Sequence, residues 1–252
     1  MIKSTFIGGV AIGLFATCAT AFAQEAVPDV EPAPGEAAPA PPAAAAPAPA
    51  SNGAGIGPRG AIEVGLRIGF GYPLGNEGAV PGTPNASLHD DVSGMIPIWI
   101  DAGFRANPNV YVGVFFQYGF AFVNNNQNPD CAQSGVSCSA KDLRLGLNVH
   151  YHFSPGESFD PWVGLGAGYE WLALDESGGG LSVSVTARGF EFGNLQLGGD
   201  FAIAPNFGIG PFFAVTLAEY SHLSGAIDTD LSPKSIHSWI MGGVRGVFDI
   251  GL

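Results

Sequence analysis

The sequence contains few charged residues, and most of them are acidic. Of 252 residues, 12% are charged, with 9 Lys and Arg against 22 Asp and Glu, and the formal net charge is −13. An ordinary soluble domain carries about 25% charged residues. Binding to nucleic-acid phosphates requires a basic surface, so this composition excludes a nucleic-acid partner. An apolar content of 46% argues against a wholly disordered chain.

Long apolar runs are absent beyond the N-terminus. No later segment approaches the roughly 18 apolar residues that a membrane-spanning helix needs, so a helical membrane bundle is excluded. The one such run, residues 6–22, follows Lys3 and ends in the sequence A-F-A, which has the form of an export signal cleaved after Ala23. We therefore predict a signal peptide over residues 1–23, with a membrane anchor as the alternative.

Cysteine is scarce. Cys18 lies in the predicted signal peptide, which leaves Cys131 and Cys138 in the segment DCAQSGVSC. Export implies an oxidising compartment, so we expect these two residues to form a disulfide. Two free thiols are the alternative, because a short loop can strain the bond. Without a nearby histidine, the pair does not predict a zinc site.

Residues 24–60 are a low-complexity segment rich in alanine and proline. Such a segment cannot bury a core, and its proline density favours an extended polyproline II conformation. We predict a disordered periplasmic linker here. It is either an inert tether or a spacer that contacts the cell wall.

From residue 61 onward, apolar residues alternate with small or polar ones. Because successive side chains of a strand point to opposite faces, this alternation predicts strands with one apolar face. The sixth strand changes phase, which predicts a bulge near Gly193 and Asn194. The predicted strands cover residues 62–72, 94–105, 110–122, 141–153, 161–174, 184–203, 207–219 and 238–252.

The connections between these strands alternate in length. Short ones are expected at 106–109, 154–160 and 204–206, and long ones at about 73–93, 123–140, 175–183 and 220–237. Strands of about ten residues match a tilted bilayer crossing, and short periplasmic turns opposite long outer loops are typical of outer-membrane barrels. We therefore predict that residues 61–252 form an all-β domain, an eight-stranded antiparallel transmembrane β-barrel in the cell outer membrane, with both termini periplasmic. A soluble β-sandwich is the structural alternative.

Residues 61–252 resemble the small eight-stranded outer-membrane barrels of the OmpA/OmpX/OmpW-like and opacity-antigen kind. The resemblance rests on the alternation, the export signal and the final segment VRGVFDIGL, whose alternating apolar residues look like an assembly signal. The segment departs from the family in ending on Leu252 where Phe or Trp is usual. The resemblance implies outer-membrane lipid and lipopolysaccharide as surroundings, the barrel-assembly machinery as a partner in biogenesis, and no cofactor.

Charged residues fall on the polar faces of the predicted strands, so we expect them to face the lumen. Side chains about fill the interior of an eight-stranded barrel, and charges away from bulk water should be paired. A salt-bridged plug is therefore expected, while the many inward glycines leave a narrow water-filled path as the alternative. The expected network comprises Glu63, Arg67, Asp101, Arg105, Asp142, Arg144, Glu170, Asp200, Arg245 and Asp249, with Arg188 and Glu191 as further candidates.

These features indicate a non-enzymatic protein with a structural or surface-interaction role. A narrow porin-like channel for small solutes is one alternative, and a lipid A-modifying hydrolase is another. The hydrolase hypothesis rests on His222 and Ser224, which resemble the His-x-Ser pair of lipid A deacylases, with Asp228 as an orienting acid. His150 and His152 share a strand face, but the sequence shows no third ligand, so no metal site is predicted.

Overall fold

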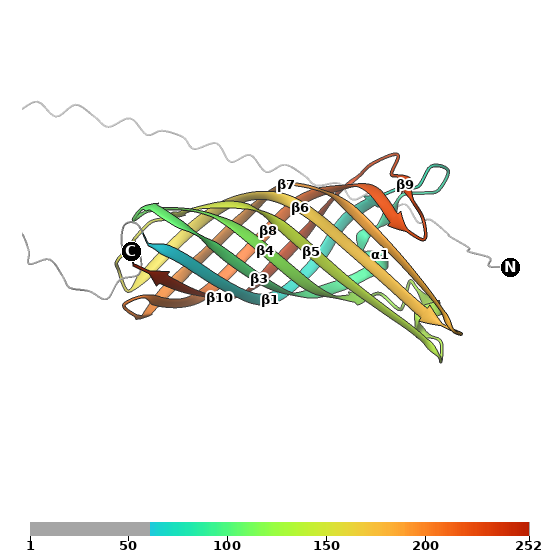
Figure 1. Cartoon of the computed structure of the whole chain (residues 1–252), viewed down its shortest axis with the longest axis horizontal. Helices are drawn as coiled ribbons and strands as arrows, with labels where there is room; N and C mark the ends of the chain where they lie inside the picture. The colour runs from blue at the N-terminus through green and yellow to red at the C-terminus, as the bar shows by residue number, and fades with distance from the viewer. Residues whose placement is uncertain (1–60, 252) are drawn as a thin grey trace, which may run out of the picture. The chain divides into compact units, whose positions relative to one another are not determined.

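The computed structural model describes residues 61–251, which form a closed ring of eight long antiparallel strands (Figure 1). Each long strand pairs with the next along the chain, and the last one closes the ring by pairing with the first. The predicted eight-stranded barrel is therefore confirmed, whereas the predicted signal peptide and linker lie outside the described residues. The long strands are β1 (Ile62–Gly78), β3 (Val92–Asn107), β4 (Val110–Val123), β5 (Val136–His152), β6 (Phe159–Gly178), β7 (Leu181–Ala204), β8 (Phe207–Gly225) and β10 (Ile236–Ile250).

Four short elements lie in the connections and were not predicted from the sequence. They are β2 (Ala86–Ser87), α1 (Leu88–Asp91), the 3-10 helix η1 (Pro129–Ala132) and β9 (Thr229–Asp230). Ser87 caps the N-terminus of α1, and its hydroxyl accepts a hydrogen bond from the backbone N–H of His89 at 3.3 Å. Within residues 61–251, the helices are too short and too polar to cross a membrane.

The two ends of the barrel differ in their connections, and we name them accordingly. At the short-turn end the strands are joined by residues 108–109, 153–158 and 205–206, and the described chain begins and finishes there. At the loop end the connections are residues 79–91, 124–135 and 226–235, together with one tight turn. This asymmetry agrees with the predicted alternation of short and long connections.

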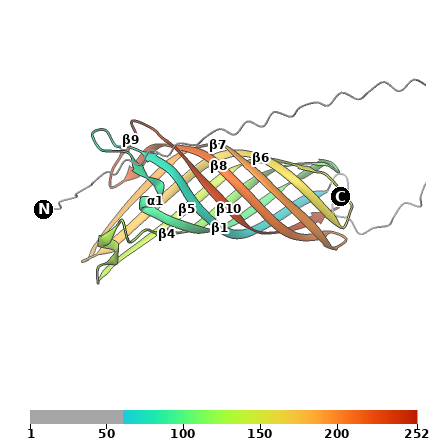
Figure 2. The same ribbon diagram turned by 180° about the vertical axis from the view of Figure 1, so that it is seen from behind.

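The tight turn corrects one prediction, a long loop over residues 175–183. Instead, β6 continues to Gly178 and β7 begins at Leu181, so only Gly179 and Gly180 join them. Both glycines have positive φ, at 60° and 83°, a conformation that side chains disfavour and that two-residue hairpin turns require. The β6–β7 hairpin and the adjacent start of β5 project at the loop end in Figures 1 and 2.

The two faces of each strand are those that the alternation predicts. On β1, Leu66 and Phe70 are 55% and 52% exposed on the outside, whereas Glu63 and Arg67 are completely buried inside. Most exposed aromatic side chains lie in two girdles on either side of a mainly aliphatic band, which also contains Phe116 and Phe213. The short-turn girdle contains Phe104, Tyr151, Phe153, Phe159, Phe201, Phe207 and Phe248, and the loop-end girdle contains Phe70, Tyr72, Phe120, Phe122, Phe190 and Phe192.

A bulge in β7 restores the register of that strand. Glu191 pairs with Ala218 and Gly193 pairs with Leu217, so Phe192 is the extra residue, one position before the predicted site. As a result, Glu191 and Asn194 are both buried inside the barrel although their positions differ by an odd number.

Candidate functional site: the polar interior of the barrel

The structure places all ten charged residues of the expected network inside the barrel, each at most 1% exposed. Glu191 joins them, also 1% exposed. Arg188 is a correction to the prediction, because it lies outside. It pairs with Trp171, whose strand neighbours Glu170 and Leu172 are the buried, inward residues. The interior residues form three groups along the barrel, which we name the loop-end, middle and short-turn clusters.

The loop-end cluster is built around Arg144. Its guanidinium donates to Asp142 at 2.9 Å, to Glu170 at 3.1 Å and to Glu191 at 3.2 Å. These three acids come from β5, β6 and β7, so one cation joins three neighbouring strands. Charge-assisted bonds of this kind are stronger than neutral ones, and the arrangement leaves the arginine fully paired.

Glu170 has further partners that sequence reasoning missed. It accepts hydrogen bonds from the Tyr220 hydroxyl at 2.7 Å and from Trp239 Nε1 at 3.2 Å, and its other oxygen lies 3.1 Å from His237 Nε2. Tyr220 and His237 were expected in an outer loop, but β8 and β10 continue far enough to carry them into the lumen. With Gln117, which donates to Asp142 at 3.0 Å, they complete the loop-end cluster.

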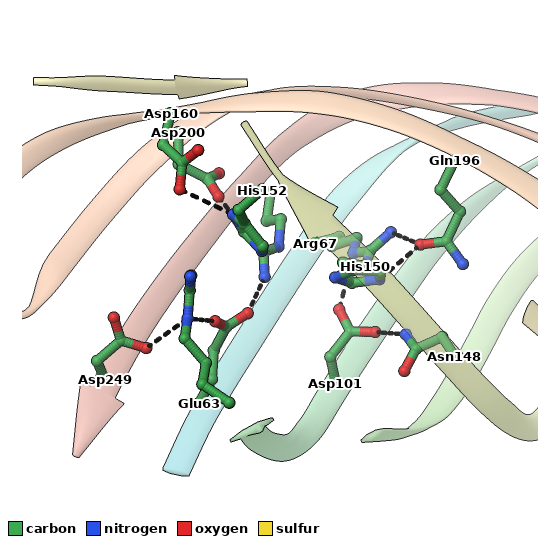
Figure 3. Close-up of polar contacts among 12 residues, drawn as sticks. Glu63, Arg67, Asp101, Asn148, His150, His152, Asp160, Gln196, Asp200 and Asp249 are labelled. Atoms are coloured by element: carbon green, nitrogen blue, oxygen red, sulfur yellow. Dashed lines mark hydrogen bonds and ion pairs between the residues drawn. The ribbon is translucent and has the colours of Figure 1, made fainter. Parts of the chain in front are cut away.

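The middle cluster contains Arg67, Asp101, Asn148 and Gln196 (Figure 3). Arg67 donates to Asp101 at 2.8 Å and to Gln196 at 2.7 Å. Asp101 also accepts from the Asn148 amide at 2.7 Å, so both of its oxygens are bonded. The Arg67 guanidinium lies 4.6 Å from the centre of the Trp99 ring, a distance typical of a cation–π contact.

The short-turn cluster contains Glu63, Arg105, Arg245, Asp200 and Asp249. The two oxygens of Glu63 accept separately from Arg105 at 2.7 Å and from Arg245 at 2.5 Å. Arg245 is also paired with Asp200, and Arg105 lies 3.8 Å from Asp249. The carboxylates therefore alternate with the two guanidiniums across the lumen.

Two histidines of β5 lie beside this cluster. His152 Nδ1 is 2.8 Å from an oxygen of Asp160, and the His150 ring is stacked between Tyr111 and Trp162. The sequence showed no third ligand for this pair. The fold supplies one, because Glu63, His150 and His152 each offer a ligand atom and these atoms lie within 4.8 Å of one another.

Several inward glycines are packed closely against large side chains. A Cβ added to Gly113 would lie 2.1 Å from the Tyr111 hydroxyl oxygen, and one added to Gly198 would lie 2.4 Å from the Trp162 ring. Large inward side chains therefore rest directly on glycine backbone. At these two positions, the space beside the glycine is filled by an aromatic ring of the same barrel.

Replacing Gly113 with alanine is expected to destabilise the barrel by about 1–3 kcal/mol, because the new methyl group must displace Tyr111 or the neighbouring strand. The nearest strand atom, the Ala102 carbonyl oxygen, is 2.7 Å from the added Cβ. Denaturant unfolding of both forms measures the difference. Gly242→Ala is the matched control, since its added Cβ would meet nothing closer than 3.7 Å. Equal effects of the two substitutions would contradict the filled-glycine interpretation.

An apolar cluster covers the polar interior at the loop end. Leu88 of α1 and Leu231 of the last loop are buried against Met95, Leu172 and Trp239. Backbone hydrogen bonds connect the first and last loops, from Ala79 to Pro233 at 3.0 Å and from Ser232 to Ala79 at 2.7 Å. Leu88 and Leu231 thus lie over the lumen as part of a connected lid of loops.

Burial also affects Asp91 in α1. It raises the pKa of the Asp91 carboxyl, a hydrogen bond with Glu77 opposes this shift, and the charge of Asp90 adds to it.

The predicted Cys131–Cys138 disulfide is present, with a Cα–Cα distance of 5.5 Å, and connects η1 to β5.

The residues of the hydrolase hypothesis lie on the outside near the loop end. His222 Nε2 is 3.2 Å from Asp228 and His222 Nδ1 is 2.8 Å from Asp230, so both ring nitrogens face carboxylates. The Ser224 hydroxyl instead donates to the Thr186 carbonyl oxygen at 3.5 Å. Because neither imidazole nitrogen is free to take the serine proton, this geometry provides no base for Ser224.

No family model matches this chain, and no curated protein sequence matches it. Solved structures that are similar to this chain include Neisserial surface protein A, Ail and OprG. Neisserial surface protein A is 15% identical, with 73% of this chain and 95% of that chain covered and a TM-score of 0.42. Ail, the attachment invasion locus protein of Yersinia pestis, is 14% identical, with 76% of this chain and 100% of that chain covered and a TM-score of 0.42. The outer membrane protein OprG from Pseudomonas aeruginosa is 13% identical, with 78% of this chain and 100% of that chain covered and a TM-score of 0.45.

Proposed function

We propose that this chain is a non-enzymatic integral outer-membrane protein with a closed lumen and a structural or surface-interaction role. One observation carries the proposal. All ten expected charges in the lumen are at most 1% exposed. A conducting pore needs a continuous water path along polar side chains, and burial of these charges supports a lumen without one.

The outer surface supports the membrane assignment. A band of exposed aliphatic side chains between two aromatic girdles is the surface that a bilayer covers in transmembrane barrels. Short turns face the periplasm in such barrels, so the short-turn end, the linker and both termini would be periplasmic. Membrane lipid and lipopolysaccharide would then surround the band, and the barrel-assembly machinery would insert it.

The loop end would face outward, and its projecting hairpin offers a surface for an interaction. The hairpin carries acidic and hydroxyl side chains, among them Asp175, Glu176 and Ser182, which line a shallow recess of about 310 Å³ with the start of β5. A polar, adaptable surface on a rigid barrel is where binding function is commonly found in such scaffolds.

Single-channel recording tests the closed lumen. The chain without residues 1–23, refolded and inserted in a planar bilayer, is expected to give no discrete current steps, because paired charges and aromatic rings fill the interior. A porin of known conductance in the same bilayer controls for insertion and sensitivity. Reproducible steps from the folded chain would replace this proposal with the narrow-channel alternative.

A further inference from the structure

We propose that Glu63, His150 and His152 bind a zinc ion inside the barrel at its short-turn end. One ligand atom from each residue lies within 4.8 Å of the others. Ligand atoms around tetrahedral zinc are roughly 3.3 Å apart, so small side-chain adjustments of about 1–1.5 Å would close the site. Two imidazoles and one carboxylate are a ligand set that zinc favours, and water takes the fourth position in such sites.

The two histidines each have one buried nitrogen without a hydrogen-bond partner. These atoms are His150 Nδ1 and His152 Nε2. Their other nitrogens are engaged. His150 Nε2 lies 3.2 Å from Gln196 Oε1, to which it can donate, and 3.4 Å from Arg67 Nη2, while His152 Nδ1 lies 2.8 Å from Asp160. Metal-binding histidines almost always have this arrangement, in which a partner on one nitrogen orients the other toward the metal.

The charge of the surrounding cluster also favours a cation. At this end the acidic side chains are Glu63, Asp160, Asp200 and Asp249, and the arginines facing them are Arg105 and Arg245. Four carboxylates against two guanidiniums leave two negative charges in a buried space, where unpaired charge is costly. One zinc ion balances them.

Protonation of both histidines is the competing way to balance this charge. It would place protons on His150 Nδ1 and His152 Nε2, the two atoms for which the structure shows no acceptor. A metal ion instead uses both atoms and draws the Glu63 carboxylate toward them. Each oxygen of Glu63 accepts one arginine bond, so lone pairs remain for a metal.

The site would connect strands that do not pair with each other. Glu63 belongs to β1 and the two histidines belong to β5, with β3 and β4 between them in the ring. The three residues appear together in Figure 3. Zinc would therefore brace the barrel across its lumen, which is a structural role and does not depend on whether the loop end binds a partner.

Zinc titration of the folded chain in detergent, prepared without a histidine tag and stripped of metal, tests the proposal. The His222→Gln background removes the exposed group of His222, Asp228 and Asp230, which could bind zinc adventitiously. Calorimetry is expected to show one zinc per chain. We expect His150→Gln and His152→Gln each to weaken binding more than about 100-fold, and Asp160→Asn to weaken it by about 10–100-fold.

His237→Gln is the matched control, because His237 is another buried histidine bonded to a carboxylate, but at the opposite end. Its zinc affinity should be unchanged. X-ray absorption of the zinc-loaded parent should show two imidazole ligands, and this measurement stands even if a variant does not fold. The absence of stoichiometric zinc, a spectrum without imidazole, or equal affinity in the His152 and His237 variants would each overturn the proposal.

Discussion

Replacing Arg144 with alanine is expected to lower the free energy of unfolding by about 3–5 kcal/mol, the cost of removing one partner from a buried ion pair. Arg144 donates to Asp142, Glu170 and Glu191, and no second guanidinium within residues 61–251 contacts these acids. The substitution therefore leaves three carboxylates close together without a cation. It also removes the contact between Arg144 and the Trp239 ring, which lies 5.6 Å away.

Equilibrium unfolding in lipid vesicles or detergent measures this loss. Arg188→Ala is the matched control, because Arg188 has the same side chain on the outer face and no ion pair among the described residues, so its effect should stay within about 0.5 kcal/mol. Arg67→Ala should also destabilise the barrel, but less than Arg144→Ala. In the Arg67 variant, Asp101 keeps its hydrogen bond from Asn148, and Arg67 donates to fewer acidic side chains than Arg144 does. Unchanged stability in both interior variants would exclude the paired-charge plug.

The alternation of residue types was sufficient to predict the strands that cross the apolar band. There, one face of each strand contacts lipid and the other faces the lumen, so apolar and polar residue types alternate with a period of two. Beyond the band that contrast disappears. Residues 175–183, DESGGGLSV, extend β6 and β7 into surroundings that are polar on both faces, and the sequence therefore looked like a loop.

The members of the interior network could be predicted for the same reason, but their partners could not. Which inward side chains meet depends on the tilt and stagger of the whole ring, because contacts across the lumen join strands that do not pair. Glu63 and His152 illustrate this, since neither strand pattern indicates that β1 and β5 face each other. Arg188 was assigned to the wrong face because the bulge at Phe192 changes the phase of its strand.

Replacing Leu147 with arginine is expected to destabilise the membrane-inserted barrel by about 2–4 kcal/mol, the cost measured for a lipid-facing charge at the bilayer midplane. Leu147 is 66% exposed on the outer face of β5. It pairs with Val114 and Ala167, and lies between Tyr151 in the short-turn girdle and the loop-end girdle. In water, an arginine at such an exposed position would cost little. The expected loss therefore comes from the bilayer and not from packing within the protein.

Leu181→Arg separates these two causes. Leu181 is 76% exposed, more than Leu147, but it begins β7 at the tip of the projecting hairpin, beyond the aromatic girdles. The same substitution there should cost no more than about 1 kcal/mol, because the charge stays in water or at the interface. Unfolding of both variants from lipid vesicles gives the comparison. Equal and small effects would place the apolar band outside a bilayer and favour a soluble protein whose exposed face is covered in another way. A large difference would place Leu147 within the hydrocarbon region of a membrane.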